Sequence, residues 1–223
     1  NLSMTPFQQR QLDLMRRMEA ALASNTAAST IVPMQTDYAN DPQVALTCES
    51  FVPDTIAETI QTTIMGPLAL IEPDFYYFPK SALHVTIQNI RVVNNPPHFG
   101  PSEIAKAQLL LSNSISQAGP FTFEYAGLLS MPTSISVIAL ITPEYDQFVK
   151  SLRQKLIDTG IPDDKKYFTD EIVFANTTIC RYTHTPSPEF IKKIETMKDI
   201  SVGNFDVPEV SLIETNAGGH PSK

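Results

Sequence analysis

The sequence predicts an α+β fold, an α/β sandwich of mixed or mostly antiparallel sheets. Segments with helical periodicity alternate with short strand-like segments along the 223 residues. Two strand-like segments, 121–128 and 135–141, follow each other directly. A purely parallel sheet does not allow such a pair, because parallel neighbours need a long crossover. Hydrophobic residues make up 42% of the chain, which is enough to close a core.

The chain starts with a predicted helix and a linker. Hydrophobic residues recur at helical spacing over 6–23, Thr5 is a candidate cap, and Pro6 suits a first helical position. Residues 24–42 are small, polar and proline-containing, which is typical of a linker. We therefore assign 1–43 to an N-terminal helix and linker docked on the body of the protein. An oligomer contact is the alternative, and the oligomeric state stays open.

The first half of the body alternates strand and helix. A strand at 44–48 precedes a helix at 54–64, whose isoleucines lie along one face, and a second strand follows at 83–93. Ser102 is a candidate cap for the next helix, and a Gly-Pro pair ends that helix.

The second half continues this alternation after the strand pair. Its further elements are a helix at 143–160, a strand at 172–182, a short helix around 190–194 and a strand at 210–213. The order indicates two similar halves, each with a polar-apolar strand between helices. We place one domain at 44–216 and a flexible tail at 217–223.

The formal net charge of −8 and an isoelectric point near 4.9 restrict the class of partner. A sequence-independent grip on long nucleic acid needs many lysine and arginine contacts to phosphates, so no long nucleic acid is expected. A small nucleotide or an RNA terminus remains compatible, because a few local donors suffice to bind one phosphate.

Cysteine content and hydropathy favour a cytoplasmic protein. Cys48 and Cys180 show no metal-ligand spacing, and reduced thiols fit them best, although one bridge is also compatible. No apolar run approaches the length of about 18 residues that spans a membrane, so no membrane association is expected. We expect no signal peptide in these residues, and a removed leader is left open.

One strand carries a candidate chemical motif. In His84-Val85-Thr86-Ile87 successive side chains point to opposite faces, so His84 and Thr86 share one face. An imidazole can exchange a proton near neutral pH, and a threonine hydroxyl can donate to a phosphoryl oxygen. Alone, the tetrapeptide is a weak signal, since a histidine on a strand is more often structural.

A second strand repeats this arrangement. Asn176, Thr178 and Arg181 occur in Asn-Thr-Thr-Ile-Cys-Arg, which has the spacing of the first motif and adds an arginine. With both motifs, the chain resembles the two-histidine (2H) phosphoesterase superfamily, the LigT-like cyclic phosphodiesterases. The mark of that family is two His-x-Thr/Ser motifs about this far apart. The order of elements from 44 to 215 and the closing pattern at 205–214 are similar to the family as well.

The resemblance implies a bilobal fold in which two mixed or antiparallel sheets, flanked by helices, enclose a central cleft. There two histidines act as acid and base on 2′,3′-cyclic phosphates or 2′–5′ linkages at RNA ends. Two threonines hold the phosphate, and no metal or other cofactor takes part. On this chain His84 and Thr86 match the first motif, and Thr178 matches the second threonine. Arg181 matches the trailing arginine, a bidentate phosphate donor if it faces the cleft.

Asn176 departs from the family pattern. An amide can donate a hydrogen bond but cannot shuttle a proton, and losing one partner of an acid/base pair costs about 10²–10⁴ in rate. His98, His184 and His220 do not replace it by their positions in the sequence. We therefore expect impaired phosphodiesterase activity. A non-catalytic nucleotide-binding or protein-interaction module is the alternative. A third interpretation is an enzyme in which water or a substrate hydroxyl replaces the histidine.

Other features are interpreted as structural. The aromatic run at 74–79 could stack a nucleobase, yet such density is typical of packing. Cys180 shares the face of Thr178 by parity, and we interpret it as packing beside the cleft, not as a nucleophile. The charged run at 163–166 is expected to be a solvated turn. Asn176 also fits the N-x-T acceptor pattern of glycosylation, which its place in an apolar strand disfavours.

Overall fold

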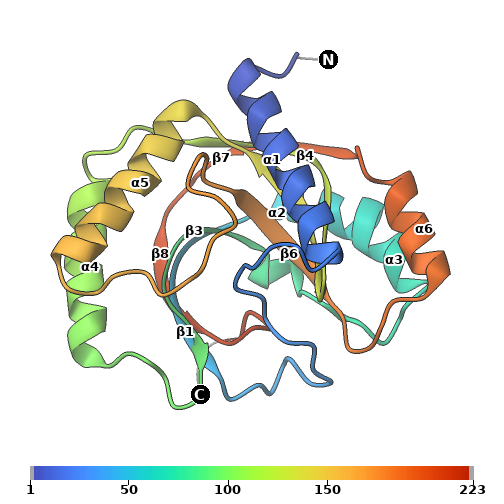
Figure 1. Cartoon of the computed structure of the whole chain (residues 1–223), viewed down its shortest axis with the longest axis horizontal. Coiled ribbons are helices and arrows are strands. Elements are labelled where there is room, and N and C mark those ends of the chain that lie inside the picture. Colours follow the sequence, from blue (N-terminus) through green and yellow to red (C-terminus); the bar gives the residue numbers. More distant parts are fainter. Residues whose placement is uncertain (1–2, 221–223) are drawn as a thin grey trace.

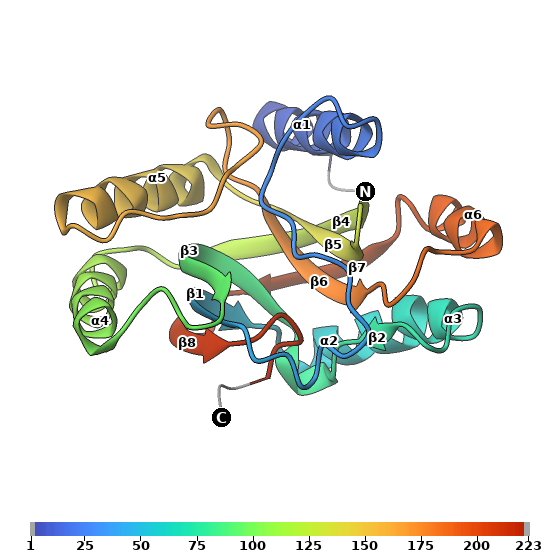
Figure 2. The same cartoon turned by 60° about the horizontal axis from the view of Figure 1, so that its bottom comes forward.

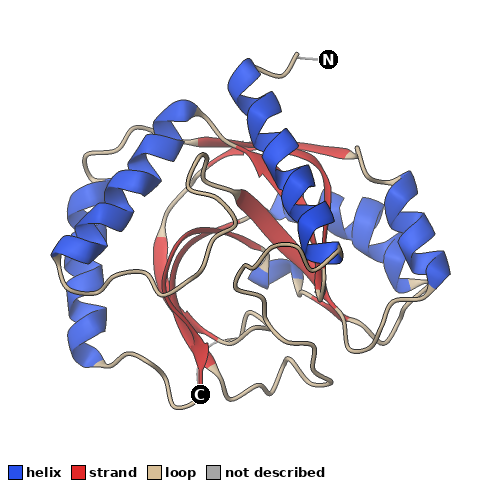
Figure 3. Ribbon diagram, in the orientation of Figure 1, coloured by secondary structure: helices blue, strands red, loops and turns tan. Residues whose placement is uncertain are grey.

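The computed structural model describes residues 3–220 and contains two antiparallel sheets (Figures 1 and 2). The smaller sheet has the strand order β3-β1-β8, and the larger has the order β2-β6-β5-β4-β7. Every strand pairing among the described residues is antiparallel. Helices lie on the outside of the two sheets (Figure 3). The α+β sandwich predicted from the sequence is therefore confirmed.

The strands are β1 (Val44–Phe51), β2 (Tyr76–Tyr77), β3 (His84–Asn94), β4 (Thr122–Met131), β5 (Ser134–Leu140), β6 (Ala175–Arg181), β7 (Ser201–Asp206) and β8 (Ser211–Thr215). The helices are α1 (Pro6–Ala23), α2 (Asp54–Ile60), α3 (Gly66–Ala69), α4 (Pro101–Ile115), α5 (Pro143–Asp158) and α6 (Pro188–Thr196). A π-helical turn, η1 (Gln61–Met65), joins α2 to α3, and a 3₁₀ turn, η2 (Lys80–Ala82), precedes β3.

Helix starts follow local side-chain chemistry. The Thr5 hydroxyl accepts a hydrogen bond from the backbone N–H of Gln8, and the Gln8 side chain accepts one from Thr5, so α1 begins with the predicted cap. The predicted Ser102 cap of α4 is wrong. The helix starts after Gly100, whose N–H donates to the Glu103 carboxylate at 2.8 Å.

Several predicted elements differ from the structure in their bounds, and the strands β2 and β7 were not predicted. The helix predicted at 54–64 continues through η1 into α3, because the π-helical turn keeps the chain helical past Ile64. The strand predicted at 172–182 is shorter, since pairing with β5 begins only at Ala175. Strand β7 was not predicted, and it pairs with β4 as an edge strand.

Helix α1 packs on the larger sheet. Its buried residues Met15, Met18 and Leu22 form a cluster with hydrophobic side chains of β4 and β5. The Gln11 side chain is fully buried, donates to the Ala139 carbonyl at 3.0 Å and accepts from the Ile141 N–H at 3.0 Å. The helix is thus docked by both apolar contact and backbone hydrogen bonds. The division of the chain at residue 44 stays a prediction.

The C-terminal segment is also held in place. The Asn216 side chain accepts hydrogen bonds from the backbone N–H groups of Gly218 and His220, and it donates to the carbonyls of Ala39 and Asp41. Residues 217–220, assigned above to a flexible tail, therefore fold back against the loop before β1. Residues 221–223 of that tail lie outside the described part.

The state of the two cysteines and the hydropathy of the helices can be compared with the sequence predictions. Cys48 and Cys180 are both free and buried. Within residues 3–220, no helix combines the length and the apolar character needed to cross a membrane.

Candidate active site

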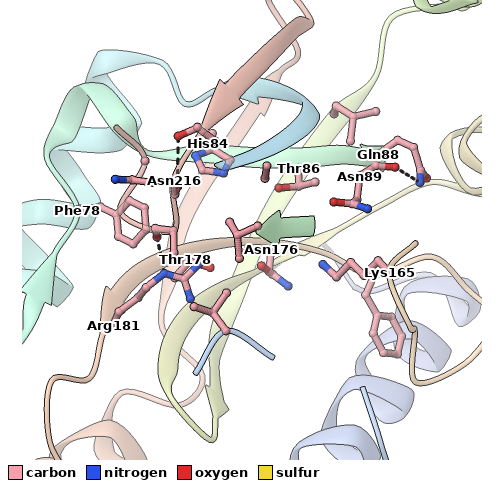
Figure 4. A pocket seen from close by; sticks show the side chains of 18 of the residues that line it. Phe78, His84, Thr86, Gln88, Asn89, Lys165, Asn176, Thr178, Arg181 and Asn216 are labelled. Carbon is pink, nitrogen blue, oxygen red and sulfur yellow. Dashed lines mark hydrogen bonds between the residues drawn. The ribbon is translucent and has the colours of Figure 1, made fainter. Parts of the chain in front are cut away.

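The two motif strands come together from different sheets. Strand β3 is an edge of the smaller sheet, β6 belongs to the larger one, and the two lie against each other. A cavity of about 200 Å³ between them is lined by all five predicted site residues, which are His84, Thr86, Asn176, Thr178 and Arg181. Figure 4 shows these side chains around the same space. Their roles in catalysis stay predictions.

Alternation along β3 places the first motif. His84 and Thr86 are half-buried and line the cavity, whereas Val85 between them is fully buried in the core. The face shared by His84 and Thr86 is therefore the cleft face, as the pattern of the strand predicted.

A bulge in β6 places the second motif. Neighbouring residues of β5 pair with Thr178 and Cys180, which are two apart, so one extra residue is inserted in β6. The alternation shifts by one residue at this point. Arg181 consequently lines the cavity with Thr178, and Cys180 is fully buried instead. The parity argument for Cys180 was wrong for this reason, and burial raises the pKa of its thiol.

His84 is fixed through both ring nitrogens. Its Nδ1 donates to the Ala82 carbonyl at 2.8 Å, and its Nε2 lies 2.9 Å from a carboxylate oxygen of Glu49. Burial alone would lower the pKa of His84. The hydrogen bond and the charge of Glu49, with the Ala82 carbonyl, outweigh burial and raise the pKa above 6.5. The contact with Glu49 therefore favours the protonated form of the imidazole.

Sequence reasoning did not find Glu49. It lies on β1 opposite Thr86, and its side chain is only 3% exposed. The signal available in the sequence was an acidic residue inside the apolar strand VALTCESF. A buried carboxylate is costly unless it has a partner, so such a residue calls for a nearby donor or cation.

Arg181 is a half-buried cation on the cavity wall, and no counter-ion is found for it among the described residues. Its Nε donates to the Ala217 carbonyl at 2.6 Å, and the guanidinium lies 5.7 Å from the centre of the Phe78 ring. Within residues 3–220 no carboxylate oxygen lies within 4.0 Å of its nitrogens. Burial lowers the pKa of Arg181, which marks an incompletely solvated positive charge. Such a group is suited to bind an oxyanion.

Lys165 was also missed, and the solvated turn predicted at 163–166 is wrong in part. Asp163 accepts a hydrogen bond from the Asn89 side chain on β3 at 2.7 Å, so this side of the turn is bound to the smaller sheet. Lys165 is half-buried and lines the cavity, and its amine points toward Asn176 (Figure 4).

His98, His184 and His220 do not line the cavity, so none of them takes the place of Asn176. His98 is exposed in a loop, and His184 lies 3.5 Å from the Glu72 carboxylate. His220 Nε2 is 2.8 Å from the Tyr76 hydroxyl. No group of three His, Cys, Asp or Glu side chains in the described part of the chain is arranged to hold a metal ion.

The aromatic run before β3 is mostly packing, in agreement with the sequence interpretation. Phe75 and Phe78 are buried, and the Tyr77 hydroxyl donates to the Glu72 carbonyl at 2.9 Å. Phe78 also forms part of the cavity wall near Arg181. Among residues 74–79, Phe78 is the one that lines the cavity.

Known proteins resemble this chain in fold. No protein-family model matches it, and no curated protein is significantly similar in sequence. A solved conserved protein of unknown function from Agrobacterium tumefaciens has 14% identity and a TM-score of 0.59, covering 93% of this chain and 97% of its own. A solved phosphoesterase has 14% identity and a TM-score of 0.53, and the match covers 78% of this chain and 88% of the phosphoesterase. Escherichia coli LigT complexed with ATP has 13% identity and a TM-score of 0.50, and the match covers 77% of this chain and 87% of LigT. The chain therefore has the two-sheet fold of the LigT-like phosphoesterases, as the paired motifs predicted.

Proposed function

We propose that this chain is a 2H-phosphoesterase-like protein that takes a small nucleotide phosphodiester into the cleft between β3 and β6. The ligand class is a 2′,3′-cyclic phosphate or a 2′–5′-linked RNA end. The observation that carries the proposal is the Arg181 guanidinium, which faces the cavity of the motif residues without a carboxylate partner. The LigT-like fold supports it, and one solved protein with this fold holds ATP.

The phosphate is held from both motif strands. The terminal nitrogens of Arg181 donate to two phosphoryl oxygens, and the hydroxyls of Thr86 and Thr178 donate to the others. A cavity of about 200 Å³ is smaller than common ligand pockets of about 300–1,000 Å³, so it admits the end of one nucleotide and not a polymer. The net charge of −8 points the same way, since it repels a long polyanion.

Hydrolysis needs one group to deprotonate water and another to protonate the leaving ribose oxygen. The His84–Glu49 pair is the proton donor in this proposal, because the contact with Glu49 raises the pKa of His84 and so favours its protonated form. Asn176 cannot accept the proton of water. The turnover of this chain is accordingly expected to be lower than that of a cleft with two histidines.

A non-catalytic nucleotide-binding protein is the second candidate. The contact that favours it is the one between Nε2 of His84 and Glu49, which occupies the nitrogen that would otherwise face a substrate. In that case Arg181, Thr86 and Thr178 bind the phosphate without turnover.

Calorimetric titration with 2′,3′-cyclic AMP tests the proposal. Arg181→Met is expected to weaken binding roughly 10- to 100-fold, the value of about 1.5–3 kcal/mol for hydrogen bonds to a charged group. Its free energy of unfolding is expected to stay equal or rise, since replacing a poorly solvated cation by an apolar side chain removes a desolvation cost.

The matched control is Arg10→Met, which removes an arginine that is 41% exposed and paired with Glu171 on the surface. This variant is expected to bind as the unchanged protein does. Equal affinities of the unchanged protein and Arg181→Met would contradict the proposed phosphate site.

A further inference from the structure

The Asn176 side of the cleft lacks a histidine but contains an amine. Lys165 comes from the loop between α5 and β6, lines the same cavity as His84 and Arg181, and points toward Asn176 (Figure 4). The cavity thus has a titratable nitrogen on each side. His84 lies on the β3 side, and Lys165 lies on the β6 side.

The loop that carries Lys165 is fixed at two places. On one side Asp163 accepts hydrogen bonds from the Asn89 side chain at 2.7 Å and from the Lys165 backbone N–H at 2.8 Å. On the other side the Lys166 N–H donates to the Thr30 hydroxyl at 2.7 Å, and the Thr30 N–H donates to the Lys166 carbonyl at 3.0 Å. A loop held by both β3 and the linker after α1 fixes the backbone of Lys165.

The amine of Lys165 is available for chemistry. In the described part of the chain no carboxylate oxygen lies within 4.0 Å of its Nζ, and its nearest aromatic contact is the Tyr167 ring at 5.7 Å. Burial lowers the pKa of Lys165, and the positive charges of Arg153 on α5 and Arg181 on β6 lower it further. Asp163 on the same loop opposes them, but the net direction is downward.

Two titratable groups that face one cavity are therefore shifted in opposite directions. The pKa of His84 is raised, which favours the protonated form, and the pKa of Lys165 is lowered, which favours the neutral amine. Opposite shifts of two groups that face one cavity are a usual basis for assigning an acid and a base in an active site.

We infer that Lys165 is the general base of this cleft and replaces the histidine that Asn176 does not provide. The inference rests on the proposed phosphodiesterase function. Neutral Nζ accepts a proton from water while the water oxygen bonds to phosphorus. The bond from phosphorus to one ribose oxygen breaks, and that oxygen takes a proton from the His84–Glu49 pair. The product is a phosphomonoester. Solvent then returns a proton from the lysine ammonium to the histidine.

Three variants separate proton transfer from charge. Lys165→Arg carries a permanent positive charge and cannot act as a base near neutral pH, because guanidinium is always protonated. Lys165→Met can neither accept a proton nor carry a charge. Lys166→Met is the matched control, since Lys166 is the exposed neighbour on the same loop. Thermal unfolding of all three checks that the fold is intact.

The readout is kcat and KM for 2′,3′-cyclic AMP across pH, with the affinity for the nucleotide measured separately. Lys165→Arg is expected to keep KM within a few-fold and to lose about 10²–10⁴ in kcat. In the unchanged protein kcat/KM is expected to rise with pH as Lys165 loses its proton, and this rise is absent in Lys165→Arg. Lys166→Met is expected to behave as the unchanged protein in every respect.

Each failure has a separate meaning. Unchanged kcat in Lys165→Arg would overturn the role of Lys165 and leave the phosphodiesterase function intact. Nucleotide binding without turnover by the unchanged protein would also overturn that role, and it would leave the binding form of the proposed function. A chain that neither binds nor hydrolyses the nucleotide would overturn both the role of Lys165 and the proposed function.

Discussion

At the scale of single residues, the His84–Glu49 contact decides the chemistry of the first motif. The imidazole is only 17% exposed, and without Glu49 its burial would favour the neutral ring. The carboxylate reverses that preference. The contact therefore favours the protonated form of a buried histidine.

Replacing Glu49 is expected to reverse the shift. In Glu49→Gln, burial acts with less opposition, so the pKa of His84 is expected to fall. An NMR titration of the imidazole measures this change. Glu58→Gln on α2, where the side chain is 68% exposed, is the control that leaves His84 unchanged.

The same pair makes stability depend on pH. The pKa of His84 is higher in the folded protein than its value of about 6.5 in the unfolded chain. The contact with Glu49 therefore stabilises the fold fully at pH values below the unfolded-state pKa. This stabilisation is lost as the pH rises through the folded-state pKa. The difference in free energy of unfolding between the unchanged protein and Glu49→Gln is thus larger near pH 6 than near pH 9. A pKa of His84 that stays in place in Glu49→Gln would contradict this account.

At the scale of elements, α1 is part of the structure that supports the site. Gln11 satisfies the Ala139 carbonyl and the Ile141 N–H at the end of β5, and β5 pairs with the motif strand β6. These two backbone groups are buried with it. The helix thereby covers polar backbone that the larger sheet would otherwise leave without a partner.

Removing the Gln11 side chain is expected to be costly. Gln11→Ala leaves a buried donor and a buried acceptor unpaired, at about 1–3 kcal/mol each, so the free energy of unfolding falls by several kcal/mol. Chemical denaturation of both proteins measures this difference in the free energy of unfolding. Gln9→Ala, at an exposed position two residues earlier on the same helix, is expected to change stability little. Equal stabilities of the two variants would mean that the buried amide does not anchor α1.

Elements with local signals could be predicted from the sequence, and elements set by distant contacts could not. Helix α1 was predicted at its observed bounds because Thr5, Pro6 and the apolar spacing all act within a few residues. Strand β7 contains Gly203, Asn204 and Asp206 and lacks a clear apolar alternation. Its existence depends on pairing with β4, which a local pattern does not show.

The same distinction applies to the site. His84, Thr86, Asn176 and Thr178 follow from strand alternation, which is a local rule. Glu49 and Lys165 reach the cavity through contacts between segments that are far apart in sequence. Arg181 reaches it through a bulge in β6 that depends on the register with β5. These three residues reach the cavity through tertiary contacts that no local pattern in the sequence shows.

At the scale of the whole molecule, an acidic protein contains a cationic cleft. The net charge is −8, yet Arg153 and Arg181, whose guanidinium groups are always charged, both line the cavity between the two sheets. The overall field opposes long polyanions, and the local field attracts a single phosphate. This contrast favours a mononucleotide or an RNA terminus over a nucleic acid bound along its length.

Hydrolysis of 2′,3′-cyclic AMP tests the central claim most directly. We expect the unchanged chain to produce a phosphomonoester, His84→Ala to lower kcat/KM by about 10²–10⁴, and Asn176→His to raise turnover by restoring the second histidine. Turnover by Asn176→His alone would show that the cleft is a phosphoesterase site and that this chain uses it for binding. No hydrolysis by any of the three, together with no binding of the nucleotide, would contradict the claim that this cleft is a phosphoesterase site.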